Sequence, residues 1–392
     1  MAVEQAPLVV HIIYALGTGG LENGLVNIIN RTPSQRYRHA IVCLTEAGDF
    51  ARRITVSGVE VFSLHKKPGN DLGAYWRLWR LLRRLRPAIV HSRNLAALEA
   101  QVASLPLLGV KRVHGEHGRD INDLDGSNWK FIWLRRAMGL FIGRFIAVSQ
   151  DLARWLRDTV GLGENRVRQI YNGVDWEKFS PAKDQLDAPD WPAYLGWPAH
   201  AQVVGAVGRL AEVKNQLALV DAFAELLARD ASWSEQARLV LVGDGPLRAR
   251  LEQRITERGI ADKVWLAGDR DDVHLLLRGF SLFALPSLAE GISNTVLEAQ
   301  ASGLPVLASD TGGNPELVLD GDNGLLLPIS DCSAWADAMA RLLSDSEERT
   351  AMGVRARERV RQHFNWQNTV ASYLAVYDEL LGVGRQGEVA GT

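Results

Sequence analysis

A repeated alternation of two kinds of segment constrains the fold of this sequence most strongly. Short apolar runs such as "LVVHIIYAL" have the length of buried strands, and each is followed by a segment of helical periodicity such as "LENGLVNIINRT". Strands that alternate with helices form parallel sheets that are covered by helices on both faces. The sequence therefore predicts the α/β class, with doubly wound parallel sheets.

A proline-rich stretch divides this alternation into two halves. Residues 179–202, "FSPAKDQLDAPDWPAYLGWPAHAQ", hold four prolines and no sustained periodicity, and the strand and helix pattern begins again after them. We predict a linker here, between a Rossmann-like domain over residues 1–182 and a second one over residues 200–365. The polar tail "GRQGEVAGT" at residues 384–392 is expected to be disordered.

Composition restricts the compartment. The two cysteines, Cys43 and Cys332, lie far apart and form neither a metal-ligand spacing nor a disulfide framework, which favours a reducing environment. The start of the chain is acidic and reads as a first strand, not as a signal peptide. No apolar run has the length needed to span a membrane, so a cytoplasmic location is expected.

The stretch "EGISNTVLE" is the most informative polar pattern. It follows the apolar run "FSLFALPS" and places Glu290 before a predicted helix and Glu298 inside it. The free backbone N–H groups at the start of such a helix, near Gly291 to Thr295, favour an anion such as a diphosphate. Carboxylates accept hydrogen bonds from paired sugar hydroxyls. A surface position for Glu298 is the alternative, but the neighbouring apolar residues indicate a mostly buried helix.

Two further loops follow strands of the second half. "GRLAEVKNQ" carries Arg209 and Lys214, which together can neutralise a diphosphate, and cations at a helix N-terminus are unfavourable unless an anion is bound. "VGDGP", which includes Gly243, reads as a turn between a strand and a helix.

Two patterns of the first half remain open. In "GTGGLEN" Gly17 and Gly19 fit the dinucleotide fingerprint, but Glu22 stands where its third glycine belongs, so a tight turn is equally favoured. "VHGEHGRD" offers His114 and His117 at a strand end, either as proton-carrying groups or as structural histidines. No H-E-x-x-H pattern occurs, so a zinc site is not expected.

Taken together, these patterns resemble the retaining glycosyltransferases of the GT-B fold, glycosyltransferase family four, also called group 1. The two acids of "EGISNTVLE" are flanked as in that family, by "ALPS" before and "EAQASGLPV" after. The other matching patterns stand in the family's order: "GG" and "E" within "GTGGLEN", "NGVD" at Asn172, the Arg209 and Lys214 pair, "GDGP", and "GGNPELV" at Gly312. The chain is also similar to sugar transferases of bacterial exopolysaccharide clusters, including those associated with PEP-CTERM/exosortase systems.

The resemblance implies an activity and a set of site residues. A hexosyltransferase (EC 2.4) would transfer a sugar from a nucleotide-diphosphate sugar to a saccharide or lipid-linked acceptor, with retention and without a metal or another cofactor. The two domains would face a cleft, and the helix at residues 366–383 would pack back on the first domain. The catalytic residues would be His117, Arg209, Lys214 and Glu290, with His114 as the rival of His117. The donor-binding residues would be Gly19, Gly20, Gly208, Arg209, Lys214, Gly243, Gly291, Ile292, Ser293, Asn294, Thr295 and Glu298.

The roles that the resemblance implies are specific. Arg209 and Lys214 would hold the diphosphate, Glu298 the ribose, and Glu290 the hydroxyls of the donor sugar. The acceptor hydroxyl would attack from the leaving-group face and pass its proton to a donor phosphate oxygen, so Glu290 is not expected to be a covalent nucleophile. The alternative classes are a dinucleotide-dependent oxidoreductase, which the incomplete glycine fingerprint disfavours, and a nucleotide-sugar binding protein without catalytic activity.

Charge is divided unevenly between the halves. Residues 1–190 hold 26 Lys and Arg against 19 Asp and Glu, and the rest of the chain is acidic. "WRLWRLLRRLRP" and "WKFIWLRRAMGLFIGRF" mix aromatic and basic residues at helical spacing. Such helices suit docking on the anionic inner membrane, to reach a lipid-linked acceptor, or they are core helices with a solvated basic face. Nucleic acid is a poor partner for this net acidic chain, which shows no aromatic stacking platform.

Overall fold

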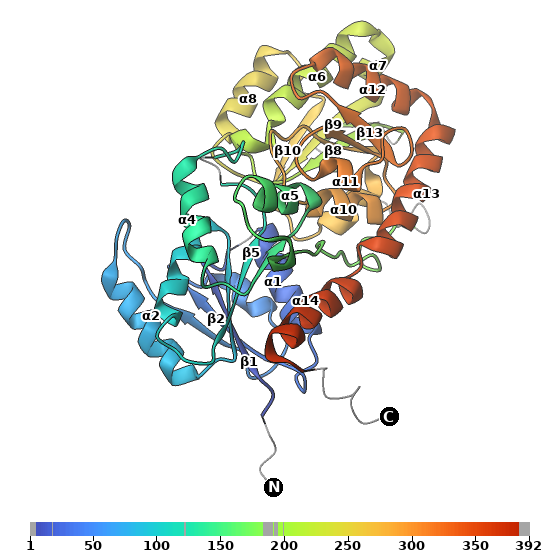
Figure 1. Cartoon of the computed structure of the whole chain (residues 1–392). Helices are drawn as coiled ribbons and strands as arrows, with labels where there is room; N and C mark the ends of the chain where they lie inside the picture. The colour runs from blue at the N-terminus through green and yellow to red at the C-terminus, as the bar shows by residue number, and fades with distance from the viewer. Residues whose placement is uncertain are drawn as a thin grey trace, which may run out of the picture. The chain divides into compact units, whose positions relative to one another are not determined.

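A computed structural model describes residues 5–17, 19–120, 123–182, 191, 195–198 and 200–383. Much of the predicted linker and the whole tail at residues 384–392 lie outside these described residues, as does Thr18 of "GTGGLEN". The chain divides into two compact units, each with its own sheet (Figure 1). The first unit runs to Gly173 and resumes at Trp366, and the second is Val174–Asn365.

The sheet of the first unit is parallel throughout, in the order β3-β2-β1-β4-β5-β6-β7. Its strands are β1 (Leu8–Ile13), β2 (Arg38–Cys43), β3 (Glu60–Ser63), β4 (Ile89–Arg93), β5 (Lys111–Glu116), β6 (Arg144–Ala147) and β7 (Val167–Gln169). Five of these strands are predicted by the apolar runs of the sequence. The two edge strands β3 and β7, which have only four and three residues, are not.

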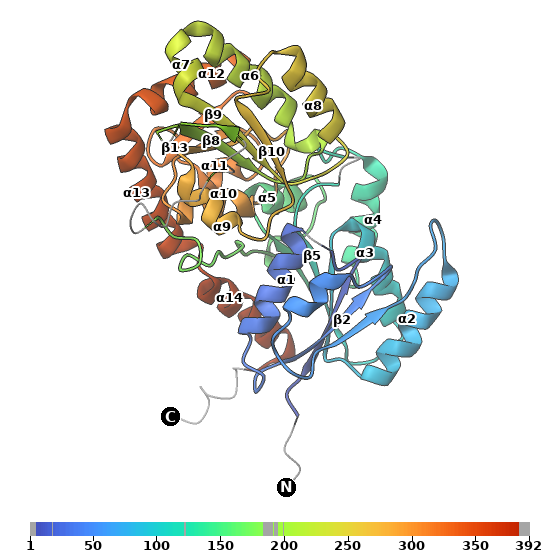
Figure 2. The same cartoon turned by 180° about the vertical axis from the view of Figure 1, so that it is seen from behind.

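Helices cover both faces of this sheet. They are α1 (Gly20–Arg31), α2 (Leu72–Leu85), α3 (Leu95–Leu98), α4 (Trp129–Gly139), α5 (Gln150–Asp158) and α14 (Trp366–Leu381), with short 3-10 turns η1 (Asp49–Arg53), η2 (Glu99–Ser104) and η3 (Glu164–Arg166). One apolar cluster joins α2 to one face of the sheet, and another joins α14 to the opposite face (Figure 2). Helix α14 therefore belongs to the first unit although it ends the chain.

The sheet of the second unit is also parallel, in the order β10-β9-β8-β11-β12-β13. Its strands are β8 (Gln202–Val207), β9 (Ala237–Val242), β10 (Val264–Gly268), β11 (Leu282–Leu285), β12 (Val306–Ser309) and β13 (Gly324–Leu327). All six strands are predicted by the apolar runs of the second half, "VVGAVGRL", "ARLVLVG", "KVWLAG", "LFALPS", "PVLASD" and "GLLLP". The α/β class with two doubly wound parallel sheets is therefore confirmed.

The helices of the second unit surround an apolar core. They are α6 (Gln216–Arg229), α7 (Ala231–Gln236), α8 (Arg248–Glu257), α9 (Val273–Leu276), α10 (Asn294–Ala301), α11 (Asn314–Leu317), α12 (Cys332–Ser344) and α13 (Ser346–His363), with 3-10 turns η6 (Glu212–Lys214) and η7 (Leu277–Gly279). The apolar run "VHLLLRGF" at residues 273–280 predicts one helix, but the structure has α9 followed by η7, because the last turn tightens before Phe280.

The strand order reverses once in each sheet. This switch point lies between β1 and β4 in the first unit and between β8 and β11 in the second. In open α/β sheets ligands bind outside the carboxyl ends of the strands at such a point. The loops that follow these four strands are therefore the places to look for a site.

Candidate active site

The loop after β8 presents two cations in different environments. Gly208 follows the strand with φ 155°, and Arg209 after it is exposed, with no side-chain partner among the described residues. The chain then turns through η6, which ends at Lys214, and enters α6 after Asn215 in the left-handed region. The loop therefore leaves the guanidinium of Arg209 available to a ligand.

Lys214 connects the loops that follow β8 and β11, the two strands at the switch point of the second unit. Its Nζ donates a hydrogen bond of 2.5 Å to Oε1 of Glu290, which lies in the loop after β11. The side chains are 23% and 9% exposed, so the pair is poorly screened by solvent. Two of the four predicted catalytic residues are thus in contact, whereas Arg209, whose side chain has no partner among the described residues, is not part of this pair.

Gly243 has a structural reason for being glycine. The turn after β9 packs closely on the loop after β8, where the N–H of Leu210 donates to the carbonyl of Asp244 at 3.0 Å. Gly243 has φ 125°, and a Cβ there would lie 2.3 Å from the carbonyl oxygen of Gly208. This close approach holds Gly208 and Arg209 in place, whatever Gly243 contributes to a ligand.

The start of α10 lies next to Glu290. Gly291, Ile292 and Ser293 are buried, and Ser293 caps the helix by accepting a hydrogen bond of 3.4 Å from the N–H of Val296. Asn294 and Thr295, both partly exposed, form the first turn, and Glu298 lies farther along the same helix, also partly exposed. The helix N-terminus therefore offers its dipole and backbone N–H groups beside the pair of Glu290 and Lys214.

Three predicted site residues belong to the first unit. Gly19 is the extended N-cap residue of α1, and Gly20 is its first residue. The carboxylate of Glu22 folds back against Gly19, since a Cβ there would lie 2.3 Å from Oε2 of Glu22. A carboxylate of the chain itself thus sits at this helix N-terminus, where a dinucleotide-binding loop would hold a phosphate.

His114 is a satisfied core residue. It is fully buried, its Nδ1 lies 2.8 Å from Oγ of Ser92, and its Nε2 lies 3.3 Å from Oε1 of Glu116. Arg135 of α4 holds the same carboxylate through two hydrogen bonds of 2.5 and 3.2 Å. Burial raises the pKa of Glu116, but Arg135 and His114 outweigh it and bring that pKa down to about 2.

His117, which with Gly19 and Gly20 makes up the predicted site residues of the first unit, lies in a different environment from His114. It is the first residue after β5, and its backbone N–H donates to Oδ1 of Asn94 at 2.8 Å. The residue is partly exposed, but both ring nitrogens are buried and have no hydrogen-bond partner among the described residues. Burial and the nearby cation Arg93 lower the pKa of His117 to about 3, so the imidazole is neutral near pH 7.

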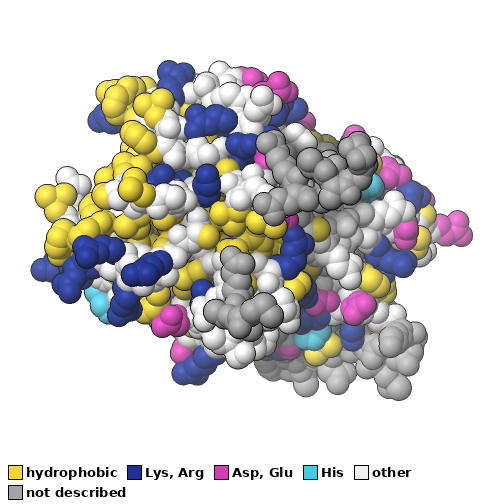
Figure 3. All heavy atoms as spheres, turned by 60° about the horizontal axis from the view of Figure 1, so that its bottom comes forward, with side chains coloured by type: hydrophobic (Ala, Val, Ile, Leu, Met, Phe, Trp, Pro, Cys, Tyr) yellow, Lys and Arg dark blue, Asp and Glu magenta, His cyan; other side chains and the backbone are white. Residues whose placement is uncertain are grey.

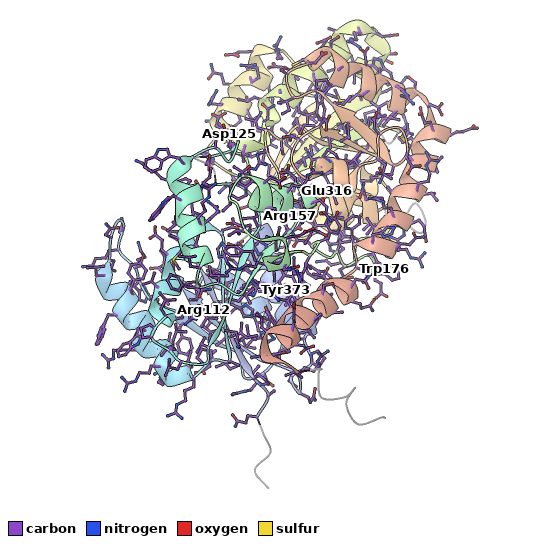
Figure 4. The ribbon with its side chains drawn as sticks, viewed as in Figure 1. Arg112, Asp125, Arg157, Trp176, Glu316 and Tyr373 are labelled. Carbon is purple, nitrogen blue, oxygen red and sulfur yellow. The ribbon has the colours of Figure 1, made fainter. Side chains whose placement is uncertain are left out.

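A buried polar network below His117 was not singled out from the sequence. Nδ1 of His39 lies 2.9 Å from Nε2 of His11, and Nδ1 of His11 lies 2.8 Å from Nη1 of Arg93. Nδ1 of His91 lies 2.8 Å from the hydroxyl of Tyr377. These side chains fill the sheet face under α14, the helix that also carries Tyr373 (Figure 4). The sequence pattern that indicates this network is a polar residue at every second position of an otherwise apolar strand, as with His91 and Arg93 in "VHSR".

The described residues offer neither a cluster of metal-ligating side chains nor a helix that could span a membrane. No group of three or more His, Cys, Asp or Glu side chains in the described part of the chain is placed to hold a metal ion. No helix within the described ranges is long and apolar enough to cross a membrane.

Comparison with known families identifies the class that this fold and these loops define. The model for Glycosyltransferase Family 4 matches residues 18–178, and that for Glycosyl transferases group 1 matches residues 201–345. The chain belongs to the group 1 glycosyltransferases of family four, which have the GT-B fold and are retaining transferases. The resemblance inferred from "EGISNTVLE" and its companion patterns is confirmed.

Individual relatives agree with this assignment. The chain is 28% identical over 350 residues to the glycosyltransferase EpsF of Bacillus subtilis (strain 168), covering 85% of this chain and 87% of EpsF. It is 27% identical over 320 residues to the UDP-Gal:alpha-D-GlcNAc-diphosphoundecaprenol alpha-1,3-galactosyltransferase of Escherichia coli, covering 80% of each. The fold matches that of Anabaena Alr3699/HepE in complex with UDP and glucose, with a TM-score of 0.81 and 22% identity over 95% of this chain and 100% of the other.

Proposed function

We propose that this glycosyltransferase transfers a sugar from a UDP-sugar to a saccharide or lipid-linked saccharide, in the synthesis of exopolysaccharide or another surface glycan. The name of the Escherichia coli relative supports both substrate classes, since it specifies a UDP-sugar donor and a diphosphoundecaprenol-linked acceptor. The similarity of the sequence patterns to transferases of exopolysaccharide clusters supports the product class.

The observation that carries this proposal is the contact between Lys214 and Glu290 beside the start of α10. It brings a cation, a carboxylate and a helix N-terminus to one switch point, where a nucleotide sugar needs all three. Arg209 and Lys214 would neutralise the diphosphate and stabilise it as it leaves. Glu290 would accept hydrogen bonds from the sugar, Glu298 from the ribose, and the amides of Gly291 to Thr295 would bind phosphate and sugar. Gly208 and Gly243 would let the backbone approach the donor.

In the first unit we propose that His117, and not His114, contacts the transferred sugar. Both ring nitrogens of His114 already have partners, whereas those of His117 have none among the described residues. A neutral imidazole can donate one hydrogen bond to a sugar oxygen and accept another. Gly19 and Gly20 would face the donor phosphates, as the family pattern implies. The acceptor proton would pass to a donor phosphate oxygen, so His117 need not act as a base.

The donor proposal is tested by saturation-transfer NMR of the full chain against UDP-, GDP- and ADP-sugars, without added metal. We expect selective binding of one UDP-sugar that is lost in Glu298→Ala. Binding of a GDP- or ADP-sugar instead would overturn the choice of nucleotide, and binding of none would overturn the donor site. A protein that binds the nucleotide sugar without catalysis would show the same selective binding, but no turnover when extracted lipid-linked glycans are supplied as acceptors.

We further propose that the first unit docks on the anionic inner membrane, on the cytoplasmic face. Trp76 of α2 and Trp129 and Trp133 of α4 are 59%, 70% and 64% exposed. Core helices with a solvated basic face would instead bury their tryptophan side chains. Arg80, Arg83 and Arg84 lie beside Trp76 and Trp79 in a shallow groove. Figure 3 shows hydrophobic side chains interspersed with Lys and Arg on the side where α2 and α4 lie in Figure 1. Exposed tryptophan beside arginine suits the headgroup region of a bilayer.

Vesicle sedimentation tests this docking. We expect the chain to sediment with phosphatidylglycerol vesicles but not with phosphatidylcholine vesicles, and Trp129→Ser/Trp133→Ser to weaken sedimentation by about tenfold or more. Val354→Ser removes an exposed apolar side chain of the second unit and is the matched control. Equal sedimentation of both variants with the wild type would overturn the docking proposal and leave the donor site untouched.

A further inference from the structure

Asn94 has an unusual backbone conformation. Four described non-glycine residues have positive φ, and of these Arg86 (φ 48°, ψ 57°) and Asn215 (φ 53°, ψ 33°) adopt the left-handed helical conformation that is common at helix ends. Asn94 has φ 57° and ψ 167°, which lies outside that region. Such a conformation is strained for a non-glycine residue and persists only where the surrounding structure enforces it.

The contacts of Asn94 explain what enforces it. Asn94 follows β4 at the switch point of the first sheet, and its backbone N–H donates to the carbonyl of Gly115 at 2.8 Å. Its side-chain Oδ1 accepts from the backbone N–H of His117 at 2.8 Å. The strained conformation thus lets Asn94 form hydrogen bonds with two positions of the neighbouring strand segment, Gly115 inside β5 and His117 just beyond it.

This double contact fixes the backbone from which the His117 ring projects. The ladder of β5 ends at Glu116, so the Asn94 side chain replaces the strand partner that the N–H of His117 lacks. The ring folds back over Gly115, where a Cβ would lie 2.9 Å from Nε2 of His117. Because the two ring nitrogens have no hydrogen-bond partner in the described part of the chain, the ring is oriented by packing and by the backbone that Asn94 holds.

We propose that Asn94 is a positioning residue that aims His117 at the donor sugar, and that its backbone strain is retained for this purpose. The inference rests on the proposed role of His117. The preceding residue reinforces the arrangement, since the buried Arg93 is among the causes that keep the pKa of His117 low. The segment from Arg93 to Asn94 therefore controls both the place and the charge of one imidazole.

Two substitutions separate positioning from a purely structural role. Asn94→Gly relaxes the backbone, because glycine tolerates this conformation, but it removes the acceptor for His117. Asn94→Asp keeps an acceptor oxygen at the same place. If Asn94 serves only the fold, the glycine variant should behave like the wild type or better.

The experiment uses the full chain labelled with carbon-13 at Cε1 of histidine, with the His117 signal assigned through His117→Gln. In Asn94→Gly we expect an unchanged or raised Tm, a displaced His117 signal, and a kcat at least about tenfold lower for the UDP-sugar selected by NMR. KM should stay within about twofold, since the uniform binding contacts remain. Asn94→Asp should keep the His117 signal close to that of the wild type and restore most of the turnover.

Arg86→Gly is the matched control, since it relaxes another positive-φ residue of the same unit without touching His117. An unchanged His117 signal and full turnover in Asn94→Gly would overturn the inference. Full turnover in His117→Gln would instead reject the proposed role of His117, while the NMR comparison would still decide whether Asn94 orients the ring. If no donor is turned over, the signal alone decides.

Discussion

The two units share a sheet topology but differ in what their sheets contain. In the second unit the buried strand residues are mostly apolar, with Arg238 of β9 and Ser309 of β12 as polar exceptions. The polar candidates Arg209, Lys214 and Glu290 lie in loops after the strands. In the first unit His11, His39, His91 and Arg93 are buried within the strands themselves. One topology can thus carry its chemistry at the rim of a sheet or inside it.

Because of this difference, the stability of the first unit should depend more strongly on pH than that of the second. Buried polar groups cost stability unless they are paired, and a buried guanidinium keeps its charge. Nε and Nη2 of Arg93 have no hydrogen-bond partner among the described residues, and within that part of the chain no carboxylate forms an ion pair with it. The neighbouring histidines must then stay neutral, and burial, followed by Arg93, lowers the pKa of His39 to about 4 and that of His11 and His91 well below its ordinary value.

The largest expected effect is acid destabilisation that is greater in the first unit than in the second, where only His274 among the described histidines has a lowered pKa, through burial. The unfolded chain protonates these histidines below their ordinary pKa of about 6.5, whereas the folded unit does not until the pH approaches about 4 for His39 and about 3 for His117. Stability is therefore present at neutral pH and is lost as the pH falls through this window. From about pH 7.5 to about pH 5.5 each of the four histidines His11, His39, His91 and His117 should cost about 1.4 kcal/mol, or about 5.5 kcal/mol together.

Hydrogen exchange read by mass spectrometry, corrected for the intrinsic effect of pH, tests this prediction unit by unit. Peptides from β1 and β4 should lose protection at the lower pH while those from β8 and β11 keep most of theirs. The exposed His65, 71% accessible in its side chain, provides a control, since His65→Gln should change nothing. Equal loss of protection in both units would contradict the comparison.

The next effect concerns the rim of the second sheet. Arg209→Ala/Lys214→Ala should lower turnover by about 1000-fold or more, because charge stabilisation of a leaving diphosphate is lost from two groups. Loss of the exposed Arg209 should change the folding of the unit little. Loss of Lys214 leaves the largely buried carboxylate of Glu290 without its cation, so the Tm of the variant is measured alongside its turnover. Steady-state kinetics with the UDP-sugar selected by NMR measures the loss of turnover. Arg341→Ala, which removes an exposed and ion-paired arginine of α12, should stay near wild-type turnover, and similar losses in both variants would reject the site.

A smaller effect distinguishes the two interiors directly. Leu282→Ala truncates a fully buried side chain of β11 and should cost about 2–5 kcal/mol. Arg93→Met in β4 removes a buried cation that lacks an ionic partner, so it should leave stability within about 1 kcal/mol of the wild type or raise it. Denaturant titration followed by hydrogen exchange in each unit compares them. A loss in Arg93→Met as large as that in Leu282→Ala would show that the network stabilises the first sheet.

The sequence predicts central strands better than edge strands. β1 and β9 are buried along their whole length, so their apolar runs are unambiguous. β3 and β7 have four and three residues and at most one buried position each, so no apolar run marks them. Helix α5, "QDLARWLRD", was overlooked although its apolar residues repeat at helical spacing, because it is short and strongly charged.

The candidate site also has a part that the sequence predicts and a part that only the structure shows. The residues of "EGISNTVLE" could be chosen from the sequence because acids, a cap and glycine stand together. The contact of Lys214 with Glu290 could not, because it joins positions 76 residues apart through the adjacency of β8 and β11. The choice between His114 and His117 needed the partners of each ring, and the strained conformation of Asn94 has no signal in residue type beyond the tolerance of asparagine for positive φ.

The smallest effect compares the helix caps of the two units. Ser149 caps α5 through a hydrogen bond of 3.1 Å to the N–H of Leu152, whereas the bond from Val296 to Ser293 at α10 is 3.4 Å long. Ser149→Ala should therefore cost about 1 kcal/mol of stability and Ser293→Ala less than half of that, because a longer hydrogen bond is weaker. Ser293→Ala should instead weaken binding of the UDP-sugar, since the hydroxyl of Ser293 orders the first turn of α10, whose backbone amides are proposed to bind the donor. Unit-resolved hydrogen exchange and ligand titration measure both quantities, and a stability loss equal to that of Ser149→Ala with unchanged binding would assign Ser293 to the fold alone.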